Sequence, residues 1–134
     1  MDWASHFPSN CPPEDAEFPN STYFRLIDGK TIKAKNFKSY RELYPEREFR
    51  VPECQAVGLS VYTDIKDIGS LIRRNPALRK KRGRNKLQLA KGDVTSDWGK
   101  IKNTRSIELS HHTWWIPLGK EPWEIFVLVN FPEE

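Results

Sequence analysis

Residues 110–117 read SHHTWWIP, and they hold two of the chain's three histidines and two of its five tryptophans. A histidine can transfer protons near neutral pH, and a tryptophan can stack on a planar ligand. If this stretch is a strand, neighbouring side chains point to opposite faces of a sheet. His111 and Trp115 would then share one face, and His112 and Trp114 would share the other.

The side chain of Ile116 indicates which of these faces is inward. Ile116 shares the face of His112 and Trp114, whereas Thr113 adds a polar group to the other face. We therefore predict that His112 and Trp114 face the core and that His111 faces a cleft. An alternative is purely structural, with one tryptophan in the core and a histidine bonded to a backbone carbonyl.

A metal site is not expected. Two adjacent histidines on a strand diverge and cannot easily bind one ion. The remaining soft ligands are His6, Cys11 and Cys54, and the sequence contains no CxxC, HxH or HExxH spacing. We predict neither a metal nor a cofactor.

Other catalytic templates are weak. The serines lack a GxSxG nucleophile elbow, and isolated glycines form no phosphate-binding loop. Cys54 has two interpretations, a nucleophile partnered by a histidine or a small buried apolar residue.

The basic residues are concentrated in one segment. The chain has a net charge of +4, and residues 73–86 carry eight basic residues and no acid. The rest of the chain then has 14 basic residues against 18 acidic ones. Such a block is typical of either a polyanion contact or a solvated loop. The predicted nucleic-acid-binding residues are Arg73, Arg74, Arg79, Lys80, Lys81, Arg82, Arg84 and Lys86.

Length and composition favour one globular domain. A chain of 134 residues can bury a real core, and an aromatic content of 12% is not typical of disorder. No run of about 18 apolar residues predicts a membrane span. The N-terminus does not resemble a secretory signal, so a cytoplasmic location is expected. Two cysteines are too few for a disulfide scaffold, and both thiols are expected to be reduced, although a disulfide between them stays open.

The order of elements predicts an α+β fold. Residues 1–20 contain four prolines and read as an extended arm, with Trp3, Phe7 and Phe18 packed on the rest of the chain. Residues 21–134 form the expected compact domain, a curved, mainly antiparallel sheet of about five or six strands with one or two short helices. Predicted helices cover residues 37–44 and a segment that is capped by Thr63 or Asp64 and ends at Asn75-Pro76. Predicted strands cover residues 23–27, 58–62, 86–90, 99–103, 111–116 and 124–130.

Two strand pairings follow from local signals. The Asp28-Gly29 turn predicts that residues 31–35 return as a hairpin partner of residues 23–27. Residues 124–130 are apolar on both faces, which predicts a central strand paired with residues 111–116.

Two resemblances can be stated. The order CPPEDA, YFRL, ECQAVGLSVYTD and SHHTWW resembles a group of small uncharacterised bacterial proteins and implies no activity. The strand YFRLI followed by GLSVYTDIKDIGSLI is similar to the layout of ADP-ribosyltransferase-like domains. That similarity implies that Arg25 and Ser60 line a nucleotide pocket, with Glu108, Glu121 or Glu124 for the catalytic glutamate.

The sequence therefore supports three alternative hypotheses about function. The first is an accessory or regulatory binding protein whose basic segment contacts nucleic acid or another polyanion. The second is a small nucleotide-handling enzyme that uses Arg25, Ser60, His111 and His112. The third is a protein-interaction module that docks through exposed tryptophans and the acidic arm. The sequence leaves open whether the protein is an enzyme.

Overall fold

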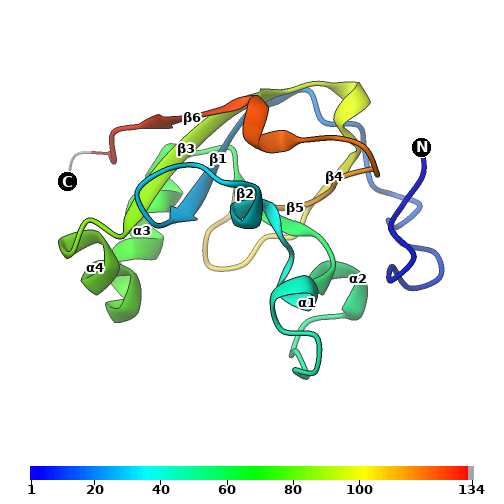
Figure 1. Cartoon of the computed structure of the whole chain (residues 1–134), viewed down its shortest axis with the longest axis horizontal. Coiled ribbons are helices and arrows are strands. Elements are labelled where there is room, and N and C mark those ends of the chain that lie inside the picture. The colour runs from blue at the N-terminus through cyan, green and yellow to red at the C-terminus, as the bar shows by residue number, and fades with distance from the viewer. Residues whose placement is uncertain (133–134) are drawn as a thin grey trace.

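Six strands form one antiparallel sheet in the computed structural model, which describes residues 1–132 (Figure 1). The sheet order is β4-β5-β2-β1-β3-β6. Residues 133 and 134, which end the predicted domain, lie outside the described residues. The predicted α+β class and single compact fold are confirmed. The strands are β1 (Ser21–Asp28), β2 (Leu59–Tyr62), β3 (Leu87–Val94), β4 (Lys100–Asn103), β5 (His111–Trp115) and β6 (Phe126–Val129).

Two helices of substantial length follow β2. The Asp64 side chain accepts a hydrogen bond from the Lys66 N–H and begins the predicted helix α3 (Ile65–Arg74). Asn75 ends α3 and caps a second helix, α4 (Pro76–Gly83), with proline at its first position. The basic segment is therefore mainly helical. The other elements are η1 (Ala34–Phe37), α1 (Tyr40–Leu43), α2 (Glu53–Ala56), η2 (Ser96–Trp98) and η3 (Pro122–Glu124).

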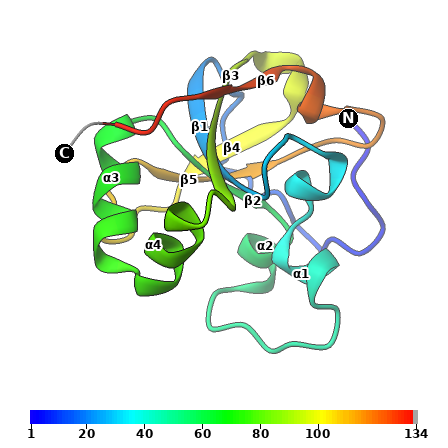
Figure 2. The same ribbon diagram turned by 60° about the vertical axis from the view of Figure 1, so that its left-hand side comes forward.

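Helices α3 and α4 cover one face of the sheet. Ile68 and Ile72 of α3 are buried against Leu87 and Leu89 of β3, and Leu78 of α4 packs against the same cluster. Figures 1 and 2 both show α3 and α4 side by side, apart from α1 and α2. None of the helices within residues 1–132 is long and apolar enough to cross a membrane.

The opposite face holds the larger core. Ile27, Val61, Trp114 and Phe126 are buried there together. Phe37 of η1 closes this core, and its ring lies 5.3 Å from that of Phe126. The sheet thus separates two apolar layers.

The N-terminal arm packs on the domain as predicted, except at Phe18, which is 54% exposed. Trp3 and Phe7 lie against Trp115, which shares the α3 side of the sheet. A disulfide joins Cys11 of the arm to Cys54 of α2, with their Cα atoms 5.6 Å apart. The prediction that both cysteines are reduced is therefore wrong. The fold brings these two residues, 43 positions apart in sequence, within bonding distance.

Two predicted pairings are wrong. Strand β6 pairs with β3 at the edge of the sheet, and Val127 is 61% exposed. Strand β5 instead lies between β2 and β4. The expected hairpin is also absent from the described chain, since β1 pairs with β2 and β3 while residues 31–33 form a loop before η1. The apolar pattern of β6 reflects an uncovered edge rather than a central position.

The expected helix over residues 37–44 is divided. Phe37 ends η1 and is buried, whereas helix α1 begins only after Ser39. Ser39 caps α1 through the Glu42 N–H, and Tyr40 and Tyr44 are exposed. The three aromatic residues therefore do not form one buried stripe.

Candidate functional site

Strand β5 buries more of SHHTWWIP than alternation predicts. Trp114 and Trp115 are each 1% exposed although they face opposite sides of the sheet. His111 is buried at 9% exposure, and His112 lines an open cleft. The prediction that His111 faces a cleft is therefore wrong. The reason is that α3 and the arm cover the His111 side, which makes both faces of β5 inward.

His111 is held by a hydrogen-bond network. Its Nδ1 lies 2.9 Å from the carbonyl oxygen of Thr104, which can only accept, so Nδ1 carries the proton. Its Nε2 therefore accepts from the Ser60 hydroxyl at 2.9 Å. Burial lowers the pKa of His111, against the opposing effect of the Thr104 carbonyl. His111 is a neutral imidazole that joins β5 to β2 and to the β4–β5 loop.

Arg25 makes a different set of contacts. Its Nε and Nη2 donate to the carbonyl of Asn36, at 3.0 and 2.8 Å, and its Nη1 donates to the carbonyl of Ser60 at 2.7 Å. The guanidinium lies over the ring of Phe37. Burial lowers the pKa of Arg25 to about 10, so the group stays charged at neutral pH. Arg25 joins β1 to η1 and β2.

The four predicted catalytic residues fall into two pairs. The side chains of Ser60 and His111 meet on the α3 side of the sheet. Arg25 and His112 lie on the opposite side, since Arg25 contacts Phe37 and His112 contacts Tyr23, both in the larger core. Arg25 reaches only the main chain of Ser60. The four side chains do not converge on one cavity.

Glu108, one of the three glutamates that the resemblance to ADP-ribosyltransferase-like domains implies as catalytic, is a buried charge with a structural partner. It is 1% exposed, and both its oxygens accept from Arg74 of the basic segment, with Nε at 2.8 Å from Oε2. The Arg74 hydrogen bond lowers the pKa of Glu108, against the opposing effect of burial. Arg74 is thus committed to holding the β4–β5 loop on α3.

The Arg74→Met variant should be less stable at pH 7, and the difference from wild type should shrink as the pH falls. A lowered carboxyl pKa stabilises the fold above its ordinary value of 4.5, and this contribution is lost as the pH falls through the lowered value. Melting temperatures measured between pH 3 and 7 test this. Arg73→Met is the control, since Arg73 is exposed and forms no ion pair within the described chain. A difference between Arg74→Met and wild type that does not change with pH would contradict the assignment.

The rest of the basic segment faces solvent. Arg73, Arg79, Lys80, Arg84 and Lys86 are exposed and pair with no carboxylate of residues 1–132. Lys81 pairs with Asp28 at 2.9 Å, and Arg82 lies over the ring of Phe131. The segment is therefore a helical array of cations, in which two members have structural contacts to neighbouring elements.

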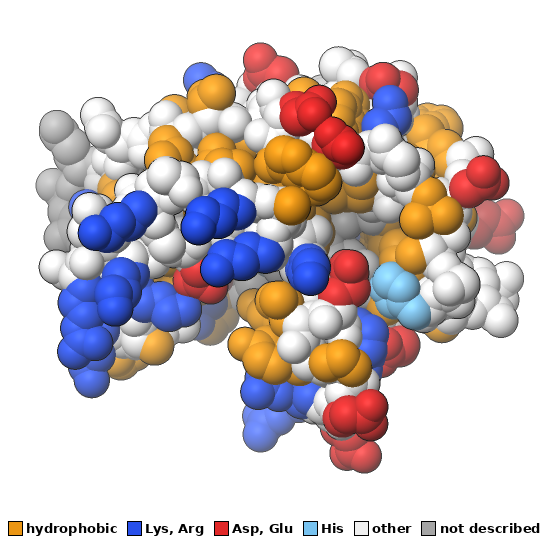
Figure 3. All heavy atoms as spheres, in the orientation of Figure 1, with side chains coloured by type: hydrophobic (Ala, Val, Ile, Leu, Met, Phe, Trp, Pro, Cys, Tyr) orange, Lys and Arg blue, Asp and Glu red, His pale blue; other side chains and the backbone are white. Residues whose placement is uncertain are grey.

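A second basic stretch lies beside α4. The Lys81–Asp28 ion pair and the bond from the Gly29 N–H to the Lys86 carbonyl, at 2.8 Å, fix the end of β1 against the end of α4. Residues 29–38 follow directly, with four lysines and no acid. Figure 3 shows Lys and Arg side chains gathered over α4 and continuing across the middle of the same side. We define the basic face as the exposed members of these two segments: Lys30, Lys33, Lys35, Lys38, Arg73, Arg79, Lys80, Lys81, Arg84 and Lys86.

No family model matches this chain, and neither the curated proteins nor the solved structures contain a significant match. Function is therefore inferred from the geometry of the chain's own residues. Within residues 1–132, no three or more His, Cys, Asp or Glu side chains cluster in a way that could hold a metal ion.

Sequence reasoning missed four of the ten residues of the basic face. The lysines of residues 29–38 are spaced along a loop, and no local run of charge singles them out. Only the antiparallel pairing of β1 with β3, which brings Asp28 opposite Leu87, joins them to α4. One feature of the sequence could have identified this segment: residues 29–38 contain no acidic residue.

Proposed function

We propose that this protein binds nucleic acid through the phosphate backbone, using the basic face on α4 and residues 29–38. The observation that carries the proposal is that two segments without acids, about 40 residues apart in sequence, meet where Asp28 and Gly29 contact Lys81 and Lys86, and that Lys and Arg side chains gather on that side of the molecule (Figure 3). Each cation that neutralises a phosphate releases condensed counterions, which drives association. The rest of the chain carries excess acid and would not attract a polyanion.

The helical form of the segment supports this over a solvated loop. Asn75 and Pro76 begin α4, and its cations lie near its C-terminus, where they also favour the helix dipole. Lys80 lies in the last turn of α4 and Arg84 caps its C-terminus, so both cations lie at the same end of the helix. An array held on a helix loses less conformational entropy on binding than the same charges on a loop.

The chemistry of the face indicates contact with the backbone rather than with bases. The exposed residues among its cations are small or polar, including Asn85, Ala77 and Gly83, and none is aromatic. Base stacking requires aromatic platforms, and sequence readout requires contacts to base edges. We therefore expect weak sequence preference.

The triple variant Lys80→Gln, Arg84→Gln, Lys86→Gln should bind a 20-base-pair DNA duplex at least about tenfold more weakly than wild type in 100 mM salt. These three residues form no ion pair within the described residues. Lys80 lies inside α4, where glutamine keeps the helix propensity, and Arg84 and Lys86 follow the helix. Fluorescence anisotropy of a labelled duplex measures the affinity.

The matched control removes the same charge elsewhere. Arg50, Lys66 and Arg105 are exposed and lie in the loop before α2, the first turn of α3 and the β4–β5 loop. Their triple change to Gln should weaken binding much less than the first variant does. Equal losses in the two variants would mean that net charge, and not the basic face, attracts DNA.

A further inference from the structure

A cleft on the larger-core side of the sheet is separate from the basic face. It has a volume of about 430 Å³ and lies where β2 ends, between β1 and β5. Ile101 is part of its lining. The arm forms one wall, because Glu17 pairs with Ile101 through two backbone hydrogen bonds of 2.7 Å before the chain crosses to β1. A cavity of this size suits a small molecule.

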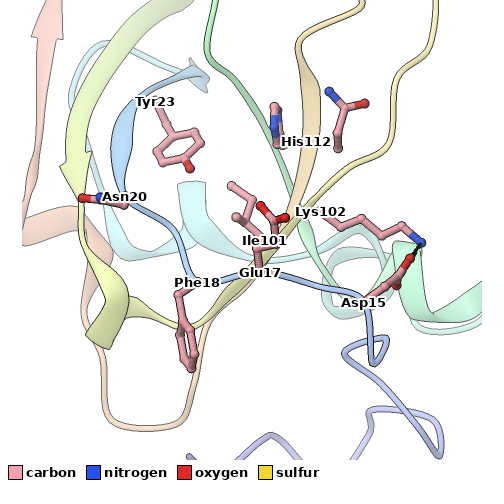
Figure 4. Close-up of a pocket in the computed structure, with 9 residues that line it drawn as sticks. Asp15, Glu17, Phe18, Asn20, Tyr23, Ile101, Lys102 and His112 are labelled. Atoms are coloured by element: carbon pink, nitrogen blue, oxygen red, sulfur yellow. Dashed lines mark hydrogen bonds and ion pairs between the residues drawn. The ribbon is translucent and has the colours of Figure 1, made fainter.

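Tyr23 contributes an unused hydrogen-bond donor. The residue is 4% exposed, and its hydroxyl reaches the cleft, as Figure 4 shows. No acceptor for the phenolic proton lies within hydrogen-bonding reach among residues 1–132. Burial raises the pKa of Tyr23, the Asn20 N–H opposes this, and the charge of Glu17 adds to it, so the proton stays on at neutral pH. A buried ring that presents an unpaired O–H to a cavity favours a ligand with an acceptor there.

His112 and Glu17 contribute acceptors. The Nδ1 of His112 lies 2.6 Å from the carbonyl of Ser110 and so carries the proton, which leaves the lone pair of Nε2 without a partner. The rings of His112 and Tyr23 lie 6.1 Å apart at 74°. The carboxylate of Glu17 forms no ion pair within the described chain, and Figure 4 shows it turned toward the space between the two rings.

The charged and amide side chains of Asp15, Lys102 and Asn103 are already paired within the protein. Asp15 and Lys102 pair with each other at 2.9 Å, at one side of the cleft. The amide of Asn103 donates to the carbonyl of Leu109 and accepts from the Arg105 N–H. Asn20 also lines the cleft, and Figure 4 shows its side chain turned away from the other groups. Tyr23, His112 and Glu17 are therefore left to select the ligand, with one donor and two acceptors.

We propose that this cleft binds an uncharged planar ligand through an edge that carries one acceptor and two N–H donors. A carbonyl of the ligand accepts from the Tyr23 hydroxyl, and its two N–H groups donate to His112 Nε2 and to the Glu17 carboxylate. A guanine base presents this edge, and a primary carboxamide carries the same groups, one acceptor and two N–H donors, with one N–H beside its carbonyl. A phosphate or carboxylate is disfavoured, because Glu17 would repel it.

Titrations of the full-length protein with guanosine and with benzamide test the proposal, with chemical-shift changes in ¹H–¹⁵N spectra as the readout. Saturable binding of either probe is expected. The probe that binds with the higher affinity shows whether the ligand is a guanine base or a carboxamide. Inosine lacks the second donor of guanosine, so it should bind about tenfold more weakly if guanosine binds. No saturable binding of either probe by the folded wild-type protein would overturn the proposal.

Variants locate the site. Tyr23→Phe keeps the buried ring and removes the O–H, and Glu17→Gln changes an exposed side chain that the fold does not need. Tyr23→Phe should weaken binding of the probe about tenfold or more, and Glu17→Gln, which keeps an acceptor oxygen but loses the charge that strengthens the hydrogen bond, should weaken it less. Tyr44→Phe and Glu14→Gln are exposed controls outside the cleft and should leave binding unchanged. Full binding by both cleft variants would overturn the assignment. The basic-face variant should bind the probe normally, so this test is independent of the proposed function.

Discussion

The Trp114→Ala variant is expected to lose about 3–5 kcal/mol of the free energy of unfolding. Trp114 is 1% exposed, packs on Phe126 with the rings 5.9 Å apart, and donates its Nε1–H to the carbonyl of Trp98 at 2.8 Å. Truncation leaves a large cavity in the larger core and an unpaired carbonyl. Urea unfolding followed by circular dichroism measures the change.

Two further variants separate the causes of that loss. Trp114→Phe keeps an aromatic ring and removes the N–H, so it should cost clearly less than Trp114→Ala. Ile107→Ala changes an apolar residue that is 71% exposed and should stay within about 0.5 kcal/mol of wild type. A loss for Trp114→Ala no larger than that for Ile107→Ala would contradict the position of Trp114 in the core.

Removal of the Cys11–Cys54 disulfide should have an effect of similar size. The bond closes a loop with a sequence separation of 43 residues, and the chain-entropy model assigns such a loop about 4 kcal/mol of stabilisation. The double variant Cys11→Ser, Cys54→Ser should therefore unfold at a lower denaturant concentration. Wild-type protein treated with dithiothreitol should shift in the same direction.

The double variant also supplies the control for the reductant. Dithiothreitol should leave its unfolding transition unchanged, because it has no disulfide to lose. A wild-type transition that is equally insensitive to dithiothreitol would show that the bond contributes no stability. The packing of Trp3 and Phe7 on Trp115 would then hold the arm without it.

Local sequence patterns were sufficient to predict several of the helices and strands. Helix α3 was predictable because Ile65, Ile68 and Ile72 recur at helical spacing after a capping Asp64. Most strands were recognisable from runs of aromatic and β-branched residues between turn residues. These features depend on neighbours within a few positions of the chain.

Strand order and the inward faces depend on distant residues. The apolar run of β6 predicted a central strand, but its partner is β3 and its other edge is open. The alternation of β5 predicted one buried face, yet the arm and α3 bury the second face as well. The charge partner of Glu108 is Arg74, 34 positions away, and no spacing rule identifies it.

The candidate site shows the same division. The basic block of residues 73–86 was visible from composition, whereas its extension by residues 29–38 required the pairing of β1 with β3. His112 was a candidate catalytic residue but was expected to face the core, and its neighbours in the cleft, Tyr23 and Glu17, come from β1 and the arm. Both proposed sites are formed by residues that are far apart in sequence and meet only in the folded sheet, so neither could be predicted in full from the sequence.

The salt dependence of duplex DNA binding tests the proposed backbone contact most directly. If five cations of the basic face each neutralise one phosphate, the slope of log affinity against log salt should be about −4.5. Affinity for the 20-base-pair duplex should then fall about 500-fold between 50 and 200 mM salt. The Lys80→Gln, Arg84→Gln, Lys86→Gln variant should have a shallower slope, by about 2.7. No binding at 50 mM salt, or a wild-type slope near zero, would contradict the proposed function.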